Sequence, residues 1–114
     1  MDTCRVNVDM QNLSFYKDFF TFLGWKILYE EPGMLGMEDE HKTSLWFTNP
    51  LKQVRNDYDG KGTNHFGFSV ARQADVDETT AYLKDKGITA LFDTPRHRPE
   101  FSGKESTYYQ VMFE

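Results

Sequence analysis

Six side chains in this sequence have the types and the spacing that suit the binding of a small molecule. An arginine can hold a carboxylate or a phosphate with two parallel N–H groups, and a tryptophan can stack on a flat or cationic group. A histidine can ligate a metal or act as a general base. The candidate binding residues are Arg5, Asn7, Trp46, His65, Tyr108 and Gln110.

The first three candidates lie on the polar side of alternating segments. Arg5 and Asn7 alternate with the apolar residues of segment 3–8, which predicts a strand with one apolar and one polar face. Trp46 alternates with apolar neighbours within residues 43–48. We therefore expect Arg5, Asn7 and Trp46 on the face that does not pack against a helix.

The other three candidates come from the second half of the chain. His65 alternates with the apolar residues of segment 64–70. Tyr108 and Gln110 share the more polar face of segment 107–113, and we assign this face to the binding side. Each strong candidate also has a structural alternative: Arg5 can pair with a protein carboxylate, Trp46 can fill space, and His65 can bond to a neighbour.

Each half of the chain predicts a strand, then a helix, then further strands, with a loop over residues 49–63 between the halves. Asp75 resembles the start of a capping box, and Gly24 and Gly87 end the two helices. A polar loop is expected over residues 96–106. The predicted strands are residues 3–8, 25–30, 34–37, 43–48, 64–70, 88–92 and 107–113, and the first helix follows residue 12.

The repeated order indicates an internal repeat of about 60 residues. It predicts an α+β fold in one domain, residues 1–114, with module one at about 1–50 and module two at about 62–114. At 114 residues, a single domain is the expected organisation.

Composition narrows the partners and the compartment. The net charge of −5 argues against a broad grip on nucleic acid. No apolar stretch reaches the roughly 18 residues of a membrane span, and no apolar signal core stands at the N-terminus. Cys4 is the only cysteine, which excludes an intrachain disulfide. We expect a soluble cytoplasmic protein.

The sequence resembles the vicinal oxygen chelate superfamily, which includes glyoxalase I, bleomycin-resistance proteins and extradiol dioxygenases. The similarity spans nearly the whole chain. It is carried by Val6-Asn7-Val8, by Leu13 to Phe20 and Phe22 to Trp25, by Asn64 to Val70, by Val76-Asp77 and Leu83 to Ile88, and by Tyr108 to Phe113.

The resemblance implies paired βαβββ modules, each a curved sheet with its helix on the convex side. The concave sides would face a cavity that holds a small molecule, lined by the polar faces named above. Small members usually pair, so the resemblance also implies a homodimer.

Metal-dependent members place four ligands in that cavity. Carried onto this chain, the first position falls on Thr3 or Met1, the second near Trp46, and the third on His65. The fourth, a glutamate on the last strand, would lie past Glu114. Only His65 is a metal ligand by type, whereas catalytic sites keep three or more protein ligands. We therefore expect no cofactor, although a divalent metal at His65 stays an alternative.

The resemblance also implies a last strand that this sequence lacks, lying between the strands at His65 and Tyr108. Leaving it out would expose two rows of unpaired backbone groups. Three explanations stay open: a longer chain, which we favour, a strand from a partner chain, or a rearranged sheet.

Two functions follow as hypotheses. The first is a small-molecule-binding protein of the resistance or sequestration type, without an intact metal site. The alternative is a metal-dependent lyase, isomerase or dioxygenase that uses His65 and residues beyond this chain end, with the metal polarising adjacent substrate oxygens.

Overall fold

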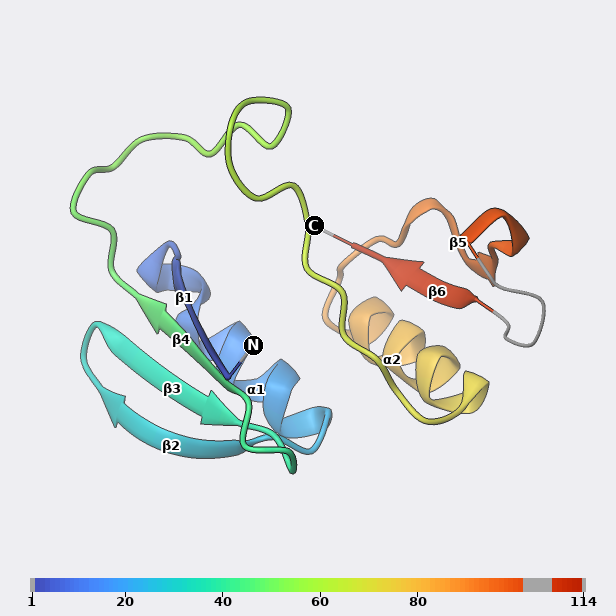
Figure 1. Ribbon diagram of the computed structural model, residues 1–114, viewed down its shortest axis with the longest axis horizontal. Coiled ribbons are helices and arrows are strands. Elements are labelled where there is room, and N and C mark those ends of the chain that lie inside the picture. The colour runs from blue at the N-terminus through green and yellow to red at the C-terminus, as the bar shows by residue number, and fades with distance from the viewer. Residues whose placement is uncertain (1, 102–107, 114) are drawn as a thin grey trace. The chain divides into compact units, whose positions relative to one another are not determined.

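The computed structural model describes residues 2–101 and 108–113. The chain forms two compact units, Met1–Asp57 and Tyr58–Glu114 (Figure 1). The first unit contains a four-stranded sheet and one α-helix, and the second contains one α-helix and a two-stranded sheet.

The first unit has the order strand, helix and three strands. The elements are β1 (Thr3–Asn7), a short 3-10 helix (Met10–Asn12), α1 (Leu13–Phe22), β2 (Lys26–Glu31), β3 (Met34–Glu38) and β4 (Ser44–Thr48). In the sheet they are ordered β1-β4-β3-β2, with β1 parallel to β4 and the other pairs antiparallel. Every element predicted for this half is confirmed, with bounds that differ by about one residue.

The core of the first unit lies between α1 and one face of the sheet. Phe20 of α1 is only 3% exposed and its ring centroid lies 5.6 Å from that of Phe47 on β4. Tyr16 stacks on the same Phe47 ring at 4.7 Å. Leu35 and Met37 on β3 are almost fully buried beside it. The side chains that alternate with these therefore point away from α1.

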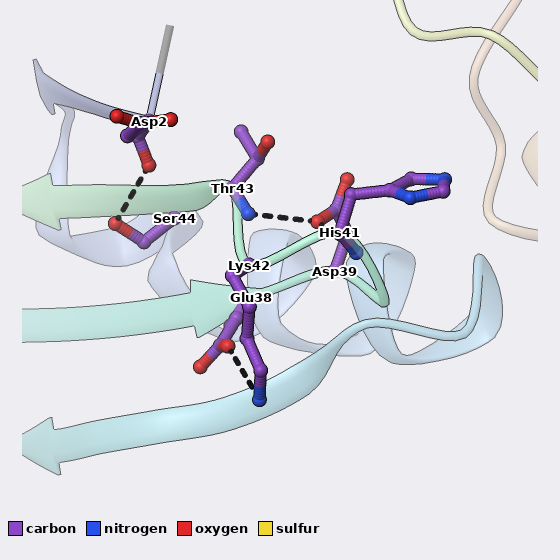
Figure 2. A network of polar contacts seen from close by, with 7 residues as sticks. All are labelled: Asp2, Glu38, Asp39, His41, Lys42, Thr43 and Ser44. Carbon is purple, nitrogen blue, oxygen red and sulfur yellow. Dashed lines mark hydrogen bonds and ion pairs between the residues drawn. The ribbon is translucent and has the colours of Figure 1, made fainter.

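A tight loop sets the register between β3 and β4 (Figure 2). The Asp39 carboxylate accepts the backbone N–H groups of His41 and Thr43, both at 2.9 Å. Lys42 has a left-handed φ of 64° and its ammonium pairs with Glu38 at 3.1 Å. Because these contacts fix the loop, they also fix which residues of β3 and β4 stand opposite each other.

The second unit contains α2 (Gln73–Asp85), β5 (Leu91–His97), a 3-10 turn (Pro99–Phe101) and β6 (Tyr109–Met112). The prediction that α2 begins at Asp75 is wrong. The helix begins at Gln73, and the Asp75 carboxylate accepts the backbone N–H of Arg72 at 3.0 Å, so Asp75 caps from inside the first turn.

In the second half, residues 64–70 were predicted to form a strand equivalent to β1, and this prediction is wrong. No strand is assigned there, and no strand within residues 2–101 and 108–113 pairs with it. Phe66, Phe68 and Val70, expected under a helix, are 45%, 44% and 41% exposed. Alternation alone does not make a strand, because a strand needs a neighbour for its hydrogen bonds.

The strand predicted at residues 88–92 begins later than expected and is longer. β5 begins at Leu91 and continues through Pro95, so Arg96 and His97 belong to a strand and not to the predicted loop. The Thr94 hydroxyl donates to the Leu91 carbonyl at 2.6 Å and accepts the Met112 N–H at 2.8 Å. This side chain bridges a shift in the β5–β6 register. Residues 102–106 of the predicted loop lie outside the described residues.

Candidate functional site

The sheet of the first unit presents a polar and aromatic face on the side away from α1. Its central row crosses four strands: Arg5 pairs with Trp46, Trp46 with Gly36, and Gly36 with Tyr29. We call this row of four residues, Arg5, Trp46, Gly36 and Tyr29, the Trp46 platform.

Trp46 is held flat against the sheet because its neighbour has no side chain. A Cβ built on Gly36 would lie 2.6–2.8 Å from three carbons of the six-membered ring of the indole. The Tyr29 ring stands beside the indole at 6.0 Å, tilted by 42°. The indole N–H donates to the Ser44 hydroxyl at 3.2 Å, which fixes the rotation of the ring. Trp46 is half-buried, so part of the ring stays accessible.

Arg5 lies next to the indole and is exposed. Within the described part of the chain its guanidinium has no ion pair, hydrogen bond or ring contact. The neighbouring Asn7 is bonded differently, because its side-chain oxygen accepts the Thr48 hydroxyl at 2.9 Å. The guanidinium of Arg5 is therefore available to a ligand, whereas the side-chain amide of Asn7 already makes one hydrogen bond within the protein.

Two carboxylates near the Trp46 platform already interact with other side chains of the protein. The Glu38 side chain is 16% exposed and pairs with Lys42. A hydrogen bond to Glu31, followed by partial burial, raises the pKa of Tyr29 above its ordinary value.

Thr3 and Trp46, at two of the implied metal positions, are both hydrogen-bonded to Ser44. The Ser44 hydroxyl donates to the Thr3 hydroxyl at 2.9 Å and accepts the Trp46 N–H. Neither a threonine hydroxyl nor an indole is a usual ligand for a catalytic divalent metal. Within residues 2–101 and 108–113 no three His, Cys, Asp or Glu side chains gather as a metal site. These residues do not fit a metal centre.

The three remaining candidates belong to the second unit. His65 is exposed and its Nδ1 lies 3.0 Å from the Asn64 side-chain oxygen. Tyr108 is 43% exposed and Gln110 is half-buried. The Tyr109 hydroxyl donates to Asp77 of α2 at 2.7 Å, so Gln110 lies on the side of β6 away from the helix. The site that the structure assembles contains Arg5, Asn7 and Trp46.

Sequence reasoning missed two parts of this site, Gly36 and Tyr29. The signal for Gly36 was a glycine inside a short apolar strand, which often marks a close approach of another group. No comparable signal pointed to Tyr29, because β2 carries a register shift between Ile27 and Tyr29 that alters the alternation.

One other surface feature carries none of the candidate residues. A small apolar hollow lies at the C-terminal end of α2 and is lined by Thr80, Leu83, Lys84, Gly87, Ile88, Thr89 and Ala90. Among the residues described, no helix is long and apolar enough to cross a membrane.

Known structures share this fold over nearly the whole chain. A "putative glyoxalase" from Bacillus halodurans is 24% identical, with a TM-score of 0.81, and the match covers 100% of this chain and 86% of that one. A possible glyoxalase from Bacillus cereus is 17% identical with a TM-score of 0.63, covering 98% and 89%. A lactoylglutathione lyase from Agrobacterium tumefaciens is 15% identical with a TM-score of 0.53, covering 86% and 75%. At these identities the likeness establishes the fold, and it confirms the predicted α+β class.

No curated protein sequence matches the chain. The sequence pattern of one family does match, over residues 4–106. This span covers most of the chain and confirms the resemblance drawn from the motifs. The chain belongs to the Glyoxalase/Bleomycin resistance protein/Dioxygenase superfamily.

Proposed function

We propose that this protein binds a small molecule and has no intact metal site. Arg5, Asn7 and Trp46 would contact the ligand from the first unit. In the second unit, His65, Tyr108 and Gln110 stay predicted binding residues. The role would be of the resistance or sequestration type, in which binding itself is the activity.

One observation carries this proposal: the Trp46 indole is fixed flat and only half-buried beside a guanidinium that has no ion pair among the described residues. A packed structural tryptophan would bury both faces of its ring, and a structural arginine would have a carboxylate beside it. An aromatic surface with a few polar groups beside it is typical of small-molecule sites.

The test is a thermal-shift screen against a chemically diverse library, followed by calorimetric affinities for every hit. Trp46→Ala removes the stacking surface and should weaken the hits about tenfold, since a stacked ring contributes on the order of 1 kcal/mol or more. Tyr58→Ala is the matched control, because it removes an aromatic ring that is 50% exposed outside the sheet. Unchanged affinities in Trp46→Ala for every hit would show that the site is elsewhere.

We also propose a cytoplasmic homodimer. The dimer rests on the family resemblance, and the compartment on the single cysteine, which forms no intrachain disulfide. Light scattering on the purified protein tests the dimer: a mass near 27 kDa, twice the 13.4 kDa of this chain, is expected. A mass of one chain at all concentrations would contradict it.

A further inference from the structure

We infer that the Trp46 platform selects planar organic anions, with a flat ring system on the indole and a carboxylate or a similar anion on Arg5. This inference rests on the proposed function and gives it a ligand class.

The ring preference comes from the geometry around Gly36. One face of the indole lies against the backbone at Gly36, at a distance that admits no Cβ. The accessible part of the ring is therefore its opposite face. Tyr29, at 6.0 Å and tilted by 42°, borders that surface without stacking on it. A flat aromatic ligand matches such a surface, because aromatic rings stack favourably in an offset, parallel arrangement.

The charge preference comes from Arg5. It stands directly opposite Trp46 in the parallel pairing of β1 and β4, and adjacent strands are about 4.8 Å apart. It is the only charged residue of the four in the platform row. A ring stacked on the indole would therefore hold its substituent within reach of the guanidinium, which binds carboxylates through two parallel hydrogen bonds.

A cationic ligand is the main competitor, since a tryptophan also attracts cations. Two features oppose it. Arg5 would repel a cation placed over the ring, and the carboxylate of Glu38 is largely buried and neutralised by Lys42 at 3.1 Å. Because the whole chain carries a net charge of −5, the attraction for an anion must be local to Arg5.

The experiment uses three probes with one ring system: 2-naphthoate, 2-naphthalenemethanol and 2-naphthylmethylammonium. The chain has two tryptophans, so a nitrogen-15 spectrum reports two indole N–H signals, and Trp25 serves as the internal control. Naphthoate should shift the Trp46 signal to saturation and leave the Trp25 signal in place. It should bind about tenfold more tightly than the alcohol, and the ammonium should bind most weakly.

Variants at Arg5 test the charge directly. Arg5→Gln should reduce the affinity for naphthoate about tenfold, to that of the alcohol, and should leave the alcohol unchanged. Arg5→Lys keeps the charge and loses the paired geometry, so an intermediate affinity is expected. Arg55→Gln makes the same change of charge outside the sheet and should have no effect. Circular dichroism checks that each variant is folded.

The outcomes separate this inference from the proposed function. If the alcohol or the ammonium binds at Trp46 as tightly as naphthoate, or if Arg5→Gln has no effect, the anion preference is wrong while binding at the platform stands. If none of the three probes shifts the Trp46 signal, the inference as a whole is wrong. The proposed function fails separately, when the screening hits do not depend on Trp46.

Discussion

The indole of Trp46 and the backbone of Gly36 are in contact on adjacent strands of one sheet. A Cβ added at Gly36 would lie 2.6 Å from the nearest ring carbon, closer than such atoms approach in proteins. A glycine is therefore required at position 36 because of the neighbouring Trp46 indole, and not because of a turn. The same contact fixes the ring orientation on which the proposed site depends.

Gly36→Ala should destabilise the protein and impair binding together. The added methyl forces the indole off the sheet, and overpacking of this kind costs about 1–3 kcal/mol. Urea unfolding measures the free energy of unfolding, and the naphthoate titration measures the binding affinity of the Trp46 platform. Gly67→Ala is the control, since a Cβ there would meet nothing within 4 Å. Equal effects of the two substitutions would contradict the close contact at Gly36.

Thr94→Val should destabilise the second unit. It replaces a hydroxyl that accepts the Met112 N–H at 2.8 Å where the β5–β6 ladder is interrupted. An amide that loses its partner costs about 1–3 kcal/mol. Thr94→Ser keeps the hydroxyl and should retain most of the stability. Hydrogen exchange at Met112 is the direct measurement, and unchanged protection in Thr94→Val would disprove the bridging role.

The first turn of α2 should loosen in acid. Hydrogen bonding to Arg72 lowers the pKa of Asp75 below its ordinary value of 3.8. A folded pKa below the unfolded one means that this contribution is complete above about pH 5 and is lost as the pH falls through the folded pKa. Amide exchange at the start of α2 should therefore accelerate between pH 5 and pH 2, relative to the intrinsic rate.

Asp75→Asn tests the cause of that acid response. In this variant the backbone amides at the start of α2 should exchange faster already at pH 7. Their protection from exchange should no longer change through the acid range. Asp85→Asn, at the other end of the helix, makes the same substitution and should keep the response of the parent protein. If Asp85→Asn removes the response as Asp75→Asn does, the cap is not its source.

Metal binding should be weak and independent of His65. Within the described residues no cluster of ligands surrounds this side chain, so metal analysis after incubation with nickel, zinc, manganese or iron should give well under one ion per chain. His65→Ala should give the same value as His41→Ala, an exposed histidine in the β3–β4 loop. About one ion per chain, lost only in His65→Ala, would favour the metalloenzyme alternative.

The success of the sequence-based prediction differed between the two halves for physical reasons. In the first unit each alternating segment has a neighbouring strand, so the pattern around Trp46 indicated both the strand and its faces. Residues 64–70 alternate equally well, but no described strand pairs with them. In β5 the strand continues across Pro95 because Thr94 supplies bonds that the backbone pattern does not reveal.

The candidate site was predictable only in part. Alternation placed Arg5 and Trp46 on the polar face, where the structure has them. The role of Gly36 depends on which residue stands opposite it, and the register is set by the loop around Asp39. One sequence without its register does not reveal such cross-strand partners.

The alternation along β4 separates two kinds of evolutionary change. Leu45 and Phe47 are 5% and 3% exposed beneath α1, whereas Ser44 and Trp46 stand on the opposite face. Substitutions at the second pair can therefore alter the proposed binding face while the hydrophobic core is inherited unchanged. An insertion or deletion of one residue would exchange the two faces, so new specificities in this lineage should arise by point substitution.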